Sequence, residues 1–179
     1  MAEAVDRRPW PGRVLWVLLF VALVMVALMP FDTMPPVRAG PDLLLAITLL
    51  WVMRRPDLVP MPVIAVSWFI ADFLLQRPPG LMTAFVLIAT EALRRRNTGL
   101  RALPLVLEWL TASAVIIAVT LGYRIVLALL VTSQAPLGLS LMQMAMTILA
   151  WPVVALVARF VFGITRPAPG EVDALGKPI

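Results

Sequence analysis

Apolar residues along the chain fall into six runs, separated by short segments rich in proline, glycine and arginine. Within each run apolar residues follow one another without the strict alternation of a half-buried strand, a pattern typical of helices in apolar surroundings. We therefore predict six helices, at about residues 14–29, 42–54, 59–76, 81–94, 103–131 and 139–164.

The predicted helices differ in length. The apolar part of the second, Leu43 to Met53, rises about 16 Å, roughly half of a hydrocarbon core. Such a helix must use flanking residues, thin the bilayer locally or pack inside the protein. The fifth run, Leu103 to Val131, would rise about 43 Å, so we expect it to tilt, bend or begin along the interface.

The composition narrows the class of protein. The chain has 179 residues, of which 61% are hydrophobic and 14% charged, more apolar surface than a water-soluble domain buries. We expect an all-α integral membrane protein with one polytopic domain, residues 1–165, and a disordered cytoplasmic tail, residues 166–179. The absence of Cys and His excludes thiol chemistry, disulfides and Cys/His metal sites.

Basic residues sort to one side of the predicted six-helix arrangement. The other side holds only Arg38 and Arg77. The positive-inside rule then places both termini in the cytoplasm, and the formal net charge of +5 is better explained by orientation on an anionic membrane face than by nucleic acid. The residues on the basic side are Arg7, Arg8, Arg13, Arg54, Arg55, Arg94, Arg95, Arg96, Arg101, Arg166 and Lys177.

Two charged residues lie within apolar runs towards the outer side. A carboxylate costs about 2.5–3.5 kcal/mol at mid-bilayer and much less near an interface, and Asp72 lies about 7 Å inside the outer boundary marked by Arg77. Arg124 also lies in the outer half, and Ser113 and Thr120 share its helix face, which favours a polar stripe turned towards protein. We predict that Asp72 and Arg124 meet. The alternative is that Asp72 snorkels or accepts a local hydrogen bond.

Other acids lie at helix ends. Asp42 follows Pro41 at the outer start of the second helix, near the positive end of its dipole. Glu91 and Glu108 are expected near the cytoplasmic rim; for Glu91, local pairing is the plainer interpretation. Ionisable groups therefore gather at the two rims and not at the membrane centre, which argues against a pump or proton relay. The arginines expected near these two glutamates are Arg94, Arg95, Arg96 and Arg101.

Small residues at four-residue spacing form a candidate docking surface on the fifth helix. Ala114, Ala118 and Gly122 would let another helix approach closely, although in an Ala- and Val-rich helix such spacing also arises by chance. The chain contains no nucleophile elbow, P-loop, dinucleotide glycine pattern or metal-ligand cluster. We expect no enzyme, no catalytic residue, no cofactor and no metal.

A series of short motifs runs through the chain: Pro41-Asp42-Leu43-Leu44-Leu45, Trp51, Arg54-Arg55-Pro56, Phe69-Ile70-Ala71-Asp72-Phe73-Leu74 and Pro79-Gly80-Leu81. Together these motifs resemble the rod shape-determining protein MreD family, and Glu91-x-x-Arg94-Arg95-Arg96 with Glu108-Trp109 is similar to its proteobacterial branch. The similarity covers most of the chain. One departure is Ile70-Ala71, where the family often has glycine just before the acid; alanine still allows close packing.

The resemblance implies a bacterial inner-membrane protein of the elongation machinery (elongasome), which builds lateral peptidoglycan and maintains cell shape. It implies a direct partner, the bitopic protein MreC, together with the actin-like MreB, a RodA-type glycosyltransferase and a penicillin-binding transpeptidase. It implies no catalytic activity and a six-helix fold similar to the S-component of energy-coupling-factor transporters, with no ligand site carried over. We expect MreC to dock its transmembrane helix on the small residues.

A rival hypothesis is a small-molecule, vitamin-like substrate-binding subunit of a membrane transporter. The scarcity of polar side chains in mid-helix counts against it, with Gln143 and Thr147 as the main exceptions. A third hypothesis, a non-specific lipid-packing protein, would account for the short second and fourth helices through local bilayer thinning but not for the motifs.

Overall fold

The computed structural model describes residues 10–29, 39–96, 105–132 and 134–164, and all regular secondary structure in these ranges is helical. Each helix lies where the hydropathy pattern predicts one, which confirms the all-α class for the described part of the chain. The predicted tail, residues 166–179, lies outside the described residues. The helices are α1 (Trp10–Leu28), α2 (Leu43–Arg54), α3 (Met61–Leu74), α4 (Leu81–Arg95), α6 (Leu105–Leu129) and α7 (Leu137–Phe160).

Three of these helices, α1, α6 and α7, are long and apolar enough to cross a membrane, with 19, 25 and 24 residues. Helices α2 and α3 are apolar but shorter, with 12 and 14 residues. Many large apolar side chains on the outer faces of α1, α3, α6 and α7 are exposed, among them Leu18, Phe73, Ile125 and Val153. Exposed apolar faces of this extent, joined to helices of membrane length, indicate a membrane protein.

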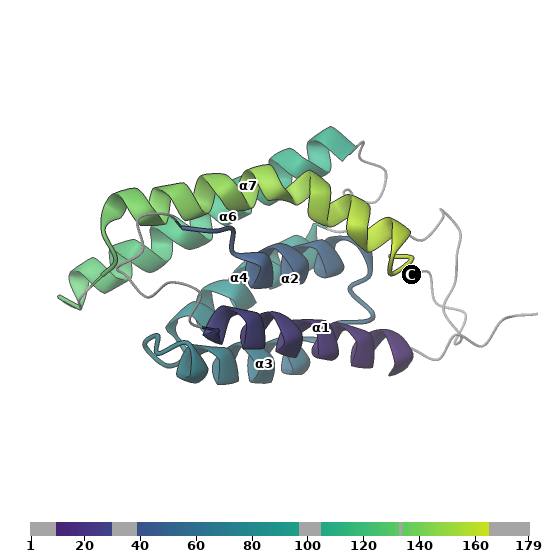
Figure 1. Ribbon diagram of the computed structural model, residues 1–179, viewed down its shortest axis with the longest axis horizontal. Coiled ribbons are helices and arrows are strands. Elements are labelled where there is room, and N and C mark those ends of the chain that lie inside the picture. The colour runs from purple at the N-terminus through teal and green to yellow at the C-terminus, as the bar shows by residue number, and fades with distance from the viewer. Residues whose placement is uncertain (1–9, 30–38, 97–104, 133, 165–179) are drawn as a thin grey trace, which may run out of the picture.

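Helix α2 lies in the middle of the molecule. In Figure 1, α1 and α3 lie side by side on one side of it, and α6 and α7 lie side by side on the other. Helix α4 packs against α2, α3 and α6, and α2 itself contacts α1, α4, α6 and α7. The shortest of the described helices is therefore the centre around which the others pack.

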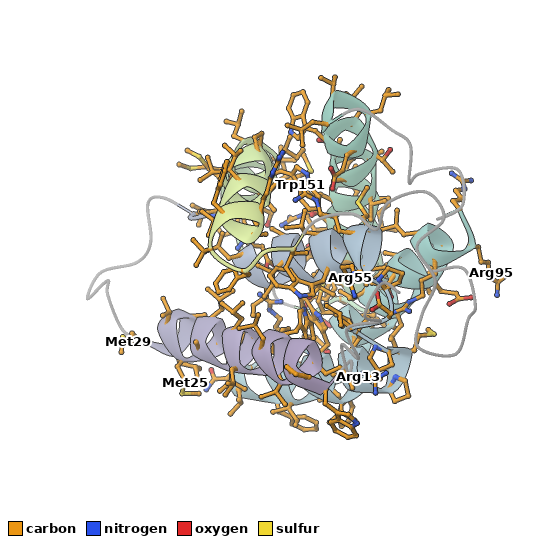
Figure 2. All side chains as sticks on the ribbon, turned by 90° about the vertical axis from the view of Figure 1, so that its right-hand side faces the viewer. Arg13, Met25, Met29, Arg55, Arg95 and Trp151 are labelled. Carbon is orange, nitrogen blue, oxygen red and sulfur yellow. The ribbon has the colours of Figure 1, made fainter. Side chains whose placement is uncertain are left out.

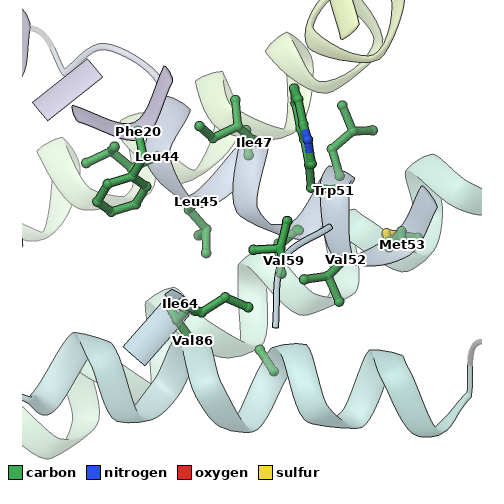
Figure 3. Close-up of a cluster of buried hydrophobic side chains, with 14 of the residues drawn as sticks. Phe20, Leu44, Leu45, Ile47, Trp51, Val52, Met53, Val59, Ile64 and Val86 are labelled. Atoms are coloured by element: carbon green, nitrogen blue, oxygen red, sulfur yellow. The ribbon is translucent and has the colours of Figure 1, made fainter. Parts of the chain in front are cut away.

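The burial of α2 decides between the three explanations for its length. Every residue from Leu44 to Arg54 is buried. Figure 3 shows Phe20 of α1, Ile64 of α3 and Val86 of α4 in the cluster of side chains around α2. A helix enclosed by protein has no need to match the lipid thickness by itself. Packing inside the protein is thus the solution that the chain adopts.

Four tryptophans complete this core, because Trp16, Trp51, Trp68 and Trp151 are each almost fully buried. Lipid chains are as apolar as leucine, so burying these residues gains little from the hydrophobic effect. What stabilises the bundle is dense van der Waals contact and the hydrogen bonds between helices. The polar side chains inside the bundle are few, but their hydrogen bonds therefore contribute strongly to its stability.

Candidate functional site

A buried ion pair joins α2 to α6. Nε of Arg54 lies 2.8 Å from Oε1 of Glu108, and Nη2 of Arg54 donates to Oε2 at 3.2 Å. The side chains are 8% and 1% exposed. Nη1 of Arg54 also donates to the carbonyl oxygens of Ala155 in α7, at 3.1 Å, and Ile164, at 3.3 Å. One guanidinium thus connects the central helix to α6, to α7 and to the segment after α7.

The positions of the two charges suit the helix dipoles. Arg54 is the last residue of α2, where the dipole is negative, and Glu108 lies in the first turn of α6, where it is positive. In the sequence, Arg54 stands out as an orientation marker and as part of the Arg54-Arg55-Pro56 motif, and Glu108 is expected beside Arg94, Arg95, Arg96 and Arg101. The described partner of Glu108 is Arg54, and Arg101 lies outside the described residues.

Three arginines meet at the turn between α2 and α3: one lies in α1, one in α4 and one in the turn itself. Nε and Nη2 of Arg55 lie 3.1 and 2.9 Å from the two carboxylate oxygens of Asp57. Nη2 of Arg13 in α1 donates to the carbonyl oxygen of Asp57 at 3.5 Å, and Nη1 of Arg94 in α4 donates to that of Pro56 at 3.1 Å. Basic residues that indicate membrane orientation in the sequence therefore also hold this turn in place.

Glu91 forms the local ion pair that its sequence context favours. Its Oε1 lies 2.9 Å from Nε of Arg95, one helical turn away, and the arginine is exposed. Such surface pairs contribute about 0.3–0.5 kcal/mol. Figure 2, which looks at this end of the molecule, labels Arg95 together with Arg13 and Arg55, so basic residues of α1, of α4 and of the turn after α2 gather at one end of the bundle.

Asp72, which is fully buried, caps the neighbouring helix α4. Its Oδ2 accepts hydrogen bonds from the backbone N–H of Gly80 (3.0 Å) and from the N–H and hydroxyl of Thr83 (3.2 and 2.8 Å). Gly80, the N-cap of α4, has φ +79°, a conformation that favours glycine. The predicted pairing of Asp72 with Arg124 is wrong, because both side chains are described and each has other partners. The local hydrogen bond, the alternative, is what forms.

Asp42 caps α2 in the way its position predicts. Its Oδ1 accepts a hydrogen bond from the N–H of Leu45 at 3.0 Å, and its own N–H donates to Oγ1 of Thr147 in α7 at 2.8 Å. Its Oδ2 lies 4.0 Å from Nη2 of Arg77, a weak electrostatic contact. Asp42 therefore fixes the start of the central helix against α7.

Arg124 holds the connection between α6 and α7. Its Nη1 donates to the carbonyl oxygen of Ala135 at 3.1 Å and to the hydroxyl of Ser140. Its own carbonyl oxygen accepts a hydrogen bond from Nε2 of Gln134 at 3.3 Å. The Asp72 carboxylate caps α4, whereas the Arg124 guanidinium holds the α6–α7 connection. The two charges lie at similar depth but bond to different segments, so they do not meet.

A cavity of about 270 Å³ lies at the end of the bundle opposite the arginine-rich end. It is lined by residues at the start of α2, in the turn between α3 and α4, at the start of α4, in the C-terminal part of α6, in the connection to α7 and in the N-terminal half of α7. Arg77, Arg124 and Asp42 are its charged residues, and glutamines contribute further polar groups. Thr120 also lines the cavity, so the predicted polar stripe of α6 does face protein at Thr120 and Arg124. The sequence alone does not predict this cavity.

The small residues of α6 do not share one environment. Ala114 and Ala118 are exposed. Gly122 is half-buried, and a Cβ built there would lie 2.6 Å from Cε1 of Phe85 in α4. Gly122 is therefore used for close packing within the chain, and only the two alanines of the predicted surface remain open.

Comparisons with protein-family models, curated proteins and solved structures found no match for this chain. The resemblance to the MreD family thus depends on the motif residues themselves. In the structure Asp42, Arg54, Asp72 and Gly80 each have a specific role, as cap, ion-pair partner or turn residue.

Proposed function

We propose that the chain is a non-enzymatic scaffold of the elongation complex in the bacterial inner membrane, where it binds MreC and supports lateral peptidoglycan synthesis. The observation that carries this proposal is the use of the polar motif residues. The side chains of Arg54 and Asp72 are buried and bonded to neighbouring helices. A catalytic group needs an atom within hydrogen-bond reach of a substrate, and the fold encloses both of these side chains.

The proposed topology has six membrane helices with both termini in the cytoplasm. It is supported by the gathering of basic residues at one end of the bundle, where α1 begins and α7 ends, as Figure 1 shows. Cationic residues concentrate on the cytoplasmic side of membrane proteins. The short central helix fits this topology because protein, not lipid, surrounds it. A resemblance to the S-component fold belongs to the same proposal.

The proposed contact with MreC is the exposed face of α6 that carries Ala114 and Ala118. Both are exposed, and Leu110 and Leu121 flank them on the same helix face. Alanine allows a second helix to approach closely, which matters in lipid because dispersion contacts fall off steeply with distance. MreB, the RodA-type glycosyltransferase and the transpeptidase would join through the same complex.

Affinity purification of the tagged protein in mild detergent, followed by mass spectrometry, tests this function. We expect MreC and the wall-synthesis enzymes at near-stoichiometric amounts. The double substitution Ala114→Leu and Ala118→Leu should reduce MreC recovery at unchanged abundance of the chain. Ala145→Leu, at an exposed alanine of α7, is the matched control and should leave recovery unchanged. Equal recovery of MreC with both variants would contradict the proposal that MreC docks on α6.

A second candidate function, a substrate-binding subunit of a transporter, is favoured by the cavity. Gln143 and Thr147, the polar residues noted in mid-helix, both line it. Recovery of a nucleotide-binding ATPase pair in place of MreC in the same purification would support this function and contradict the scaffold.

A further inference from the structure

We propose that the cavity binds a phosphate group between Arg77 and Arg124. This inference goes beyond the scaffold function and does not rest on it. Arg77, just past the end of α3, and Arg124 in the last third of α6 both line the cavity. They are 47 residues apart in the chain (124 − 77 = 47), so only the fold brings them to one site.

Both guanidinium groups keep donors available. Within the described ranges the Arg77 side chain forms no hydrogen bond; it only approaches Asp42, at 4.0 Å. The hydrogen bonds of the Arg124 side chain to described residues all start from Nη1, so Nε and Nη2 have no partner within the described ranges. The planar arginine fork matches the oxygens of a phosphate better than any other side chain.

The charge balance of the lining leaves room for one anion. Among the described residues, two arginines and one carboxylate, that of Asp42, line the cavity, and the Asp42 carboxylate already accepts the N–H of Leu45. The other nearby acid, Asp72, directs Oδ2 to the start of α4 and does not line the cavity. This excess of positive charge suits an anionic phosphate group.

The remaining lining suits the body of a phosphate ester. Amide side chains of Gln76, Gln134 and Gln143 can bond hydroxyl groups, while Met82 and Leu127 offer apolar contact. The volume of about 270 Å³ lies just below the range of drug-sized pockets, which favours a head group or a small metabolite.

The position of the cavity also favours phosphate. Helices α3 and α6 end beside it, so in a membrane it lies near the lipid head groups, where phosphate is the commonest anion. The same chemistry is offered by a phospholipid head group and by a soluble phosphate ester. The experiment must therefore separate these two sources.

Thermal unfolding of the purified full chain in a non-ionic detergent tests the proposal. The soluble probe is glycerol 3-phosphate, compared with sodium chloride at equal ionic strength. The lipid probe is dihexanoylphosphatidylglycerol, compared with dihexanoylglycerol, which has the same chains and no phosphate. The variants are Arg77→Gln and Arg124→Gln, and the matched control is Arg96→Gln, an exposed arginine at the opposite end of α4.

We expect saturable stabilisation of the wild-type chain and of Arg96→Gln by a phosphate probe, with affinity at least tenfold weaker in Arg77→Gln and Arg124→Gln. Stabilisation by glycerol 3-phosphate supports a soluble ligand; stabilisation by the phospholipid alone supports a lipid. No saturable effect of either probe, or equal affinity in all variants, overturns the proposal. If Arg124→Gln fails to fold, Arg77→Gln decides, because its side chain forms no hydrogen bond within the described ranges. MreC recovery is measured separately, so failure here leaves the scaffold untouched.

Discussion

Arg54 at the end of the central helix and Glu108 in the first turn of α6 form a two-point ion pair, with Nε and Oε1 2.8 Å apart, inside the bundle. The stability of the bundle depends on the two charges together. In apolar surroundings each charge compensates the cost of burying the other. The bundle therefore tolerates the loss of both charges better than the loss of one.

Removing one charge of this pair should be costly. We expect Glu108→Gln to lower the free energy of unfolding in detergent by about 3–5 kcal/mol, because it leaves a buried guanidinium uncompensated. The double variant Arg54→Met, Glu108→Met should lose less than the sum of the two single variants. Glu91→Gln, at a surface pair, is the control and should change stability by at most about 0.5 kcal/mol. Additive losses in the double variant would contradict a coupled pair.

The cap that Asp72 provides for α4 should depend on an acceptor more than on a charge. We expect Asp72→Ala to cost about 1–3 kcal/mol, because it leaves buried donors of Gly80 and Thr83 unpaired. Asp72→Asn keeps one acceptor oxygen and should cost less. A double-mutant cycle of Asp72→Asn with Arg124→Gln, read by thermal unfolding, should be additive. A coupling energy well above about 0.5 kcal/mol would indicate that Asp72 and Arg124 do interact.

Replacing Gly122 by a residue with a side chain should destabilise the chain. A Cβ there would lie 2.6 Å from Phe85, so we expect Gly122→Ala to destabilise the chain by about 1–3 kcal/mol despite the higher helix propensity of alanine. Gly138→Ala, where a Cβ meets nothing within 4 Å, is the matched control and should be neutral or stabilising. Phe85→Leu should relieve the penalty at Gly122. An unaffected melting temperature in Gly122→Ala would mean that α4 and α6 pack less closely.

The interior position of α2 predicts a contrast between two leucines. Leu49 in α2 is 0% exposed, whereas Leu149 in α7 is 65% exposed. We expect Leu49→Ala to cost about 2–5 kcal/mol through the cavity it leaves. Leu149→Ala should cost far less, since lipid chains can fill the space of an outward-facing side chain. Equal losses for the two variants in unfolding experiments would argue that α2 does not lie inside the bundle.

The sequence predicted helix positions, one helix cap and one surface ion pair correctly, because each of these depends on residues close together in the chain. Helix positions follow from unbroken apolar runs that end at Pro, Gly and Arg, and these signals are local. The role of Asp42 as a cap could also be predicted, because a helix N-cap involves residues only three positions apart. The pairing of Glu91 with Arg95 is also a matter of helical spacing.

Contacts between distant segments could not be read in this way. Asp72 and Arg124 lie at similar depth, yet depth does not tell which way each side chain points, and the turn at Gly80 offered Asp72 nearer donors. Likewise, four-residue spacing on α6 did not reveal that Gly122 already packs against Phe85. The partner of a small residue depends on which helix lies beside it.

The sequence by itself determined that this is a helical membrane protein, where its helices lie and which end of the bundle is basic, because hydropathy, helix breakers and charge act locally. Only the tertiary structure decided that the 12-residue helix α2 is the central one, that Arg54 meets Glu108, and that Arg77 and Arg124 share a cavity. Side chains inside an apolar bundle must find polar partners across helices, and the packing of the helices alone determines which partners are within reach.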